Sequence, residues 1–114
     1  MLTVTFYEDS RHRLSSFVGT GHVEIAETSS DEYSLVCAAV SAIMQAARLG
    51  LERVAAVPVD VHQERGDMHL RIAHAHRDEP SVAAIMRTAE LAVEQIALQY
   101  PQHVSFRRQF EPEP

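Results

Sequence analysis

The sequence predicts an α/β fold of the α+β type: two layers, with two helices packed on one face of a mixed β-sheet in the order ββαββαβ. Short segments alternate apolar and polar residues, two longer segments have apolar residues at helical spacing, and one pair of alternating segments forms a hairpin. A sheet with one apolar face needs one covering layer, and two helices supply it. The 114 residues suggest one domain, with a core at 1–110 and a tail at 111–114.

Two strands are expected in the N-terminal part of the chain. Leu2–Tyr7 alternates apolar and polar residues, and Leu14–His22 does so more weakly because serines and two glycines interrupt it. Residues 8–13 between them should form a polar turn, in which Asp9 is solvated. The polar stretch Glu24–Glu32 is expected to be a loop.

The first helix is predicted from about Tyr33 to Leu49. The segment is rich in alanine, and its apolar residues cover most of the circumference, so we expect the helix to be largely buried. Gly50 is suited to its C-terminal cap. Ser30 or Asp31 is suited to cap its start.

The next two segments predict a β-hairpin in a specific register. A two-residue turn at Arg65-Gly66 places apolar pairs on one side and polar pairs on the other. The expected pairs are Val61 with Leu70, Val59 with Ile72, Asp60 with Arg71, and His62 with His69. Pro58 has no backbone donor, which predicts a free sheet edge nearby.

A second helix and a last strand complete the predicted fold. Glu79–Tyr100 carries a clear apolar stripe, with Asp78 as a candidate N-cap and Pro80 in the first turn. Pro101 ends this helix. A short final strand is expected over His103–Arg107.

Composition excludes several classes of function. The formal net charge of -6 argues against nucleic-acid binding, which depends on neutralising phosphates. All 10 basic residues are arginine, so a Walker-type phosphate loop and a Schiff-base lysine are excluded. We see no stretch long and apolar enough to cross a bilayer, no signal-peptide pattern and no need for a cofactor. A single cysteine does not demand an oxidising compartment, and we expect a cytoplasmic protein.

The single cysteine is a candidate nucleophile. Cys37 lies in the first two turns of the predicted helix, near unpaired backbone N–H groups that favour a thiolate and can stabilise an oxyanion. His22 ends the preceding strand, and the loop can return it to the helix start as a general base. A packing cysteine beside a surface histidine explains the same residues, so the pattern alone leaves both interpretations open.

The stretch GTGHVEIAETSSDEYSLVCAAVSAIMQAARLGL resembles the signature of the bacterial ribosomal-processing cysteine protease family, Prp. Gly21, His22, Cys37 and Ser41 match its Gly-His and Val-Cys-Ala-Ala-Val-Ser-Ala segments residue by residue. The resemblance covers nearly the whole chain. It implies a thiol endopeptidase with Cys37 as nucleophile and His22 as base. It also implies a homodimer and a peptide substrate, namely the N-terminal extension of large-subunit ribosomal protein twenty-seven.

The sequence departs from the family pattern at two places. An acidic residue usually lies three positions before the cysteine, where this chain has Ser34. Asp31, one turn further back, is the candidate to orient His22 instead. The segment 23–36 between the histidine and the cysteine is also longer than usual and lacks the family's glycines, which leaves the choice of substrate open.

Two alternatives to a peptidase are set against this interpretation. His62 with His69, and His74 with His76 if extended, could offer imidazoles to zinc or copper, but no third ligand has convincing spacing, so we predict no metal. The second alternative is a non-catalytic, ribosome-associated interaction module that uses an open sheet face or edge. The reactivity of Cys37 discriminates between the module and the peptidase.

Overall fold

A computed structural model describes residues 1–21 and 31–111, and these residues form the predicted order ββαββαβ. The strands are β1 (Leu2–Glu8), β2 (Leu14–Thr20), β3 (Val59–Glu64), β4 (Asp67–Ile72) and β5 (Val104–Phe110). The helices are α1 (Asp31–Leu49) and α2 (Pro80–Gln99). A π-helical turn η1 (Gly50–Val54) follows α1, and a short 3-10 turn η2 (His74–His76) precedes α2. The predicted α+β class is confirmed.

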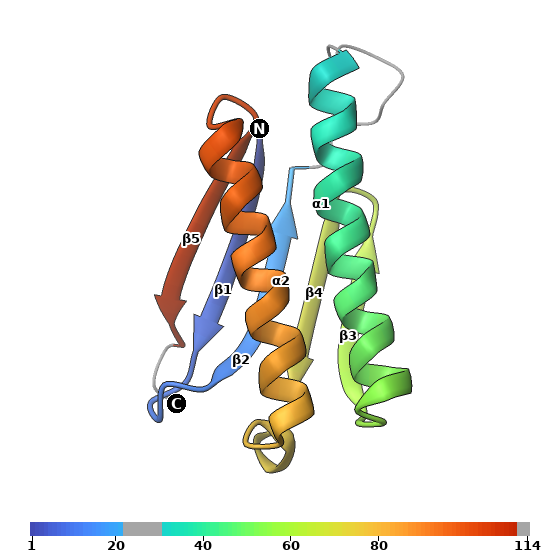
Figure 1. The fold of residues 1–114 in the computed structure, drawn as a ribbon, viewed down its shortest axis with the longest axis vertical. Helices are drawn as coiled ribbons and strands as arrows, with labels where there is room; N and C mark the ends of the chain where they lie inside the picture. The colour runs from blue at the N-terminus through green and yellow to red at the C-terminus, as the bar shows by residue number, and fades with distance from the viewer. Residues whose placement is uncertain (22–30, 112–114) are drawn as a thin grey trace.

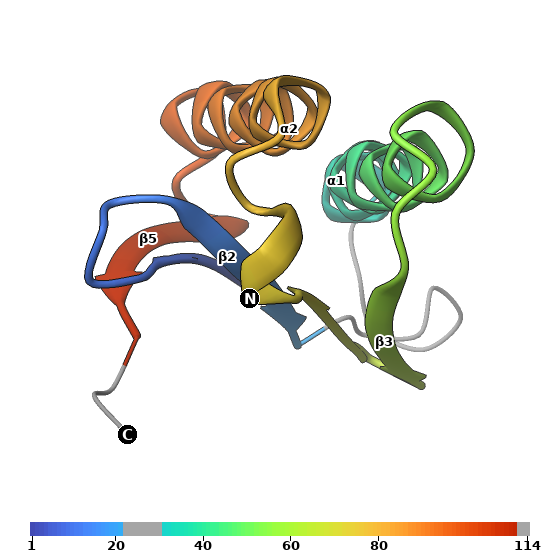
Figure 2. The same cartoon turned by 90° about the horizontal axis from the view of Figure 1, so that it is seen from below.

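The five strands form one mixed sheet in the order β3-β4-β2-β1-β5. The pair β1 and β5 is parallel, and the other neighbouring pairs are antiparallel. Both helices lie on the same face of the sheet, and the opposite face carries no helix among the described residues (Figures 1 and 2). The molecule therefore has the predicted two layers.

The β3–β4 hairpin has the predicted register. Val61 pairs with Leu70 and Asp60 with Arg71, and the strands are joined through Arg65 and Gly66 alone. Gly66 has a φ of 86°, the left-handed conformation that a tight hairpin turn requires. β3 is an edge strand, as Pro58 predicts.

The core lies between the helices and the sheet. Every second residue of the strands faces the helices, and Leu2, Val4, Phe6 and Phe17 are fully buried. The Phe6 and Phe17 rings pack with their centroids 5.4 Å apart. This apolar face determines which side of each helix must point inward.

Several predicted element ends differ by one to three residues. β2 ends at Thr20 instead of residue 22, and β5 runs three residues further than predicted, to Phe110. Asp31 and Glu32 belong to the first turn of α1 instead of the preceding loop. The segment 23–36 is therefore helical from Asp31 onward. His22 and Ser30 lie outside the described residues.

Helix α1 differs from the prediction in its burial and its end. Only an inner stripe is buried, whereas the outer face exposes alanines and Leu35, which is 72% exposed. The helix continues past Gly50 through η1, and the left-handed residue that follows is Ala56, with a φ of 56°. A β-carbon on Gly50 would lie 3.3 Å from Ile85 of α2. Gly50 therefore serves close helix packing instead of a C-cap.

One helical segment meets the criteria for crossing a bilayer, contrary to the sequence expectation. Asp31–Val54 is long enough and has a mean hydropathy of 1.5. A third of this window is buried inside the domain, where α1 packs on the sheet and on α2. A core helix of a globular domain passes the same criteria, so this single helix is only a weak indication of a membrane span.

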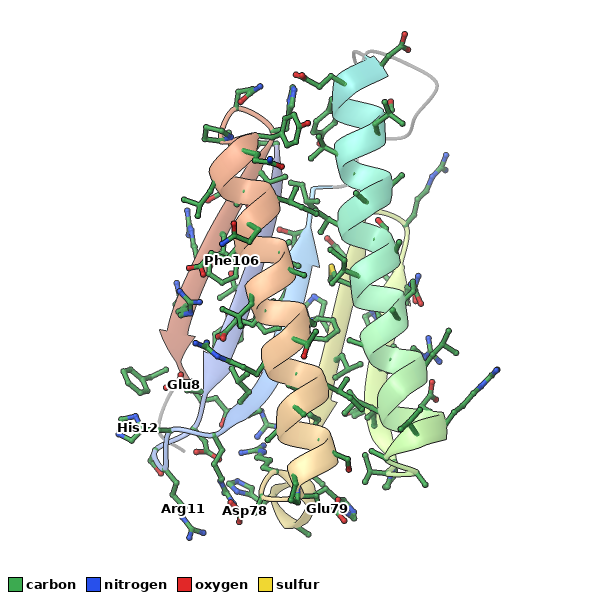
Figure 3. The ribbon with its side chains drawn as sticks, in the orientation of Figure 1. Glu8, Arg11, His12, Asp78, Glu79 and Phe106 are labelled. Carbon is green, nitrogen blue, oxygen red and sulfur yellow. The ribbon has the colours of Figure 1, made fainter. Side chains whose placement is uncertain are left out.

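Helix α2 begins without the predicted Asp78 cap. Its N-cap is Glu79, which makes no side-chain capping bond, and Pro80 follows at the helix start. Asp78 instead accepts a hydrogen bond from Arg13 Nη1 at 2.8 Å. Figure 3 shows Asp78 and Glu79 at the lower end of the molecule, at about the same level as Arg11 of the β1–β2 turn. The Asp78 carboxylate therefore forms an ion pair with Arg13, which is distant in the sequence, instead of capping α2.

The β1–β2 turn contains a buried carboxylate that the sequence placed at the surface. Asp9 is only 3% exposed. Its oxygens accept bonds from the Arg11 and Arg13 backbone N–H groups at 2.9 and 3.1 Å, and from Arg77 Nη1 at 3.0 Å. Burial by itself raises the pKa of Asp9, but these bonds and the Arg13 guanidinium outweigh it and hold the pKa well below its ordinary value.

Glu111, which follows β5, joins the Asp9 cluster because its Oε2 lies 3.7 Å from Arg77 Nη1. Glu111 belongs to the predicted solvated tail, but it is half-buried and accepts a bond from Arg71 Nη1 at 2.7 Å. Its backbone N–H donates to the Glu8 carbonyl at 2.7 Å. Residues 112–114 lie outside the described residues.

Replacing Asp9 by asparagine should lower the free energy of unfolding by about 3 kcal/mol at neutral pH, because buried Arg77 loses the carboxylate 3.0 Å away and, among the described residues, keeps only Glu111 Oε2, at 3.7 Å. The pKa of Asp9 is lowered in the folded state. Its contribution to the free energy of unfolding is therefore complete above the unfolded-state pKa of about 4 and is lost progressively as pH falls toward the folded-state pKa. Urea denaturation should therefore show a smaller difference between Asp9→Asn and wild type at pH 3 than at pH 7. Asp60→Asn, at an exposed position, is the control; an equal effect of both variants would contradict the account.

Candidate active site

Cys37 lies on the inner face of α1. It is six residues beyond Asp31, in the second turn, and it is 6% exposed within the apolar core cluster. Tyr33 and Ser41, four residues before and after it, lie on the same side of the helix because residues four apart are neighbours on a helix surface. Tyr33 is buried and Ser41 is half-buried. The thiol is therefore positioned between α1 and the sheet.

Gly21 ties the end of β2 to both α1 and the β3–β4 turn. Its N–H donates to the Gly66 carbonyl at 3.1 Å, and its carbonyl accepts from the Tyr33 hydroxyl at 3.1 Å. Its φ is 90°, and a β-carbon would lie 2.5 Å from the Met1 carbonyl oxygen. Only glycine fits this position without strain. The residue that precedes His22 is thereby anchored one helical turn before Cys37.

A polar cluster supports the start of α1 from the segment before β5. His103 Nε2 lies 2.7 Å from Glu32 Oε2, and Gln102 Nε2 donates to the same oxygen at 3.3 Å. The His103 ring packs against Tyr33, with centroids 5.3 Å apart. The carboxylates of Asp31 and Glu32, in the first turn, also stabilise the helix by their attraction to the positive end of its dipole. This cluster holds Tyr33, the residue that binds Gly21.

Ser34 and Asp31, the other predicted site residues on α1, differ in burial and in their position around the helix axis relative to Cys37. Ser34 is half-buried, one turn before it, whereas Asp31 is exposed at about 120° around the helix axis. His22 lies outside the described residues, so the pairing of His22 with Cys37 and the role of Asp31 stay predictions. Sequence reasoning missed Tyr33, Glu32 and His103, because no local pattern links these residues.

The histidines do not assemble into a metal centre in the described part of the chain. His62 and His69 are cross-strand neighbours, with ring centroids 6.1 Å apart, and His62 pairs with Glu64. His74 and His76 lie in a 3-10 turn, so the extended arrangement that would align them is absent. No group of three or more histidine, cysteine or acidic residues is close enough to hold a metal ion within residues 1–21 and 31–111.

The two-layer fold carries the one cysteine of the chain on its first helix, and comparison with protein families assigns the chain to the cysteine proteases. The family of cysteine protease Prp matches residues 1–105, and the chain belongs to this family. It is therefore a cysteine protease. A comparison with curated proteins found no match.

Solved structures share the fold. A Streptococcus mutans protein has a TM-score of 0.87 and 22% identity, over 97% of this chain and 99% of its own. The essential ribosomal-processing protease Prp from S. aureus, in complex with a substrate peptide, has a TM-score of 0.82 and 18% identity, over 95% of this chain and 99% of its own. The same S. aureus protease with a covalently linked product peptide has a TM-score of 0.76 at the same identity and coverage.

Gly21→Ala should destabilise the protein by about 2 kcal/mol, because alanine is strained at a positive φ and its β-carbon meets the Met1 carbonyl. Gly50→Ala is the control: it lies in a helical turn, where the neighbouring Ile85 side chain can shift, and should change stability by less than about 1 kcal/mol. Urea denaturation of both variants provides the measurement. Equal stability of the two variants would show that the Gly21 conformation is not required.

Proposed function

We propose that this protein is an endopeptidase that removes the N-terminal extension of bacterial large-subunit ribosomal protein twenty-seven, with Cys37 as nucleophile and His22 as general base. The observation that carries the proposal concerns Cys37. A cysteine protease needs a reactive thiol, and the chain has one cysteine. That cysteine lies one helical turn from Tyr33, whose hydroxyl binds the residue before His22.

The proposed chemistry is acyl transfer in two steps. The Cys37 sulfur attacks the scissile carbonyl as His22 takes the thiol proton, and His22 then protonates the leaving amine. Water, deprotonated by His22, attacks the resulting thioester and releases the acid product and the free thiol. Backbone N–H groups at the start of α1 are candidates to stabilise the oxyanion of each tetrahedral intermediate.

Burial of the thiol adds a requirement to this mechanism. Cys37 is 6% exposed, so a peptide carbonyl reaches its sulfur only after groups that cover it move aside. The site therefore has to open before the first step. A small electrophile such as iodoacetamide reaches the thiol through the same opening.

The nature of the substrate rests on the family and its relatives. An S. aureus relative of the same fold has been solved with a substrate peptide and is described as ribosomal-processing, which supports a peptide substrate of ribosomal origin here. The particular ribosomal protein is the one that the family resemblance implies, and a cytoplasmic location stays an expectation from the cysteine count. The homodimer implied by the resemblance stays a prediction.

The test is cleavage of a synthetic peptide that spans the extension of ribosomal protein twenty-seven from the same organism. Cys37→Ala and His22→Ala should each lower kcat/KM by about 10³-fold or more, because nucleophile and base act as a unit. His12→Ala removes an imidazole that is 74% exposed at the far end of the molecule and should cleave like wild type (Figure 3). Peptide mass spectrometry measures the products, and cleavage that survives in Cys37→Ala would refute the assignment.

A further inference from the structure

A pocket of about 250 Å³ lies between α1 and the β3–β4 turn. Ser41, Met44 and Gln45 line it from the helix, and residues 63–68 line it from the hairpin. Its volume suits a single amino-acid side chain better than a whole small-molecule ligand, since ligand pockets usually start near about 300 Å³. Among the described residues, Ser41 is the only predicted site residue in its lining, and the family match assigns no role to the pocket.

The pocket borders both segments that carry the proposed dyad. Ser41 lies one helical turn beyond Cys37, a rise of about 6 Å along the axis. On the other side, Gly66 accepts the hydrogen bond from Gly21, the residue before His22. An extended peptide advances about 3.3 Å per residue. A substrate whose scissile carbonyl meets Cys37 therefore brings a side chain about two residues away over this pocket.

The floor of the pocket is apolar and well supported. Met44 and Met68 are both buried, and Gln45 Nε2 lies 3.6 Å from the Met68 sulfur. A β-carbon on Gly19 would lie 2.6 Å from Met44 Cε, so the absent side chain at Gly19 leaves room for this methionine. Thioether surfaces of this kind pack well against the aliphatic part of a long side chain.

The rim of the pocket is polar with an excess of negative charge. Glu64 and Asp67 contribute two carboxylates, and Arg65 contributes one guanidinium. Glu64 Oε1 lies 3.2 Å from His62 Nε2. Asp67 is half-buried at the start of β4. A lysine or arginine side chain can pack its apolar stem on the methionines and place its cation near the rim carboxylates. An aspartate or glutamate side chain would place its carboxylate near charges of the same sign.

We propose that this pocket is a specificity subsite of the peptidase, which takes a lysine or arginine side chain about two residues from the scissile bond. The aliphatic stem lies on Met44 and Met68, and the cation reaches Asp67 and Glu64. The subsite rests on the proposed function, because it acts only on a peptide held at Cys37.

The experiment uses wild-type protein and a mixture of randomised octapeptides, with products identified by mass spectrometry. The sequence that is cleaved most often is then synthesised with lysine, glutamate or glutamine at each position, one at a time, within three residues of the scissile bond. At one position kcat/KM for lysine should exceed that for glutamate by about fivefold or more, as expected for a solvent-accessible charge pair near its upper limit.

Asp67→Asn and Glu64→Gln should each reduce this lysine-to-glutamate ratio by about twofold or more and change kcat/KM for the glutamine peptide less than that for the lysine peptide. Asp60→Asn is the matched control, because it removes the same charge from the same hairpin but lies outside this pocket. A ratio near one at every position would overturn the subsite, as would a ratio that neither pocket variant changes or that Asp60→Asn changes equally.

These outcomes are separable from failure of the proposed function. Cleavage that requires Cys37 but ignores charge at all positions would reject the subsite and retain the peptidase. A wild-type protein that cleaves no peptide in the mixture or the ribosomal extension would reject both. Loss of the lysine preference in Asp67→Asn, with the glutamine peptide still cleaved, supports both.

Discussion

The fold depends on the burial of one face of a five-stranded sheet. That face carries the fully buried side chains of β1, β2 and β4, and two helices are needed to remove it from water. The constraint orients α1, since only its stripe of larger apolar residues can meet the sheet. Cys37 belongs to that stripe. The position of the thiol between the layers therefore follows from the packing that stabilises the domain.

Backbone geometry at the end of β2 completes the arrangement. Gly21 turns the chain at a positive φ while its N–H and carbonyl bind the hairpin turn and Tyr33. Tyr33 is itself held by His103, and Glu32 joins His103 to the first turn of α1. Residues from β2, α1, the β3–β4 turn and the segment before β5 thus converge at one end of the molecule. A site built from four elements gains rigidity that a single loop does not supply.

Local sequence patterns predicted the hairpin register and the two-layer order because alternation and helical spacing act over a few residues. The β3–β4 pairs follow from the match of apolar and charged residues across a two-residue turn. The same reasoning failed where a distant partner decides the outcome. Asp9 is buried because Arg77, far along the chain, reaches it. Gly50 is a helix-packing residue because Ile85 approaches it, which no local pattern reveals.

The candidate site was predictable in part for the same reason. A motif names Cys37 and His22 as the candidate pair, and their pairing stays a prediction because His22 lies outside the described residues. The bond from Tyr33 to Gly21 depends on how α1 packs against the end of β2, and the pocket lined by Gln45 depends on how α1 packs against the β3–β4 hairpin. These contacts join segments that are distant in sequence, so they follow only from the tertiary structure.

The most direct test of the central claim is the rate at which iodoacetamide alkylates Cys37 in the folded protein, compared with the same thiol in the urea-unfolded chain. If the Cys37 thiol stays covered at all times, as its 6% exposure taken alone indicates, it will react far more slowly in the folded protein. A nucleophile paired with a base should react faster when folded, and His22→Ala should remove that advantage. Faster alkylation of folded wild type at neutral pH is the result predicted here. Slower alkylation of the folded protein, unchanged in His22→Ala, would contradict the assignment of Cys37 as the nucleophile.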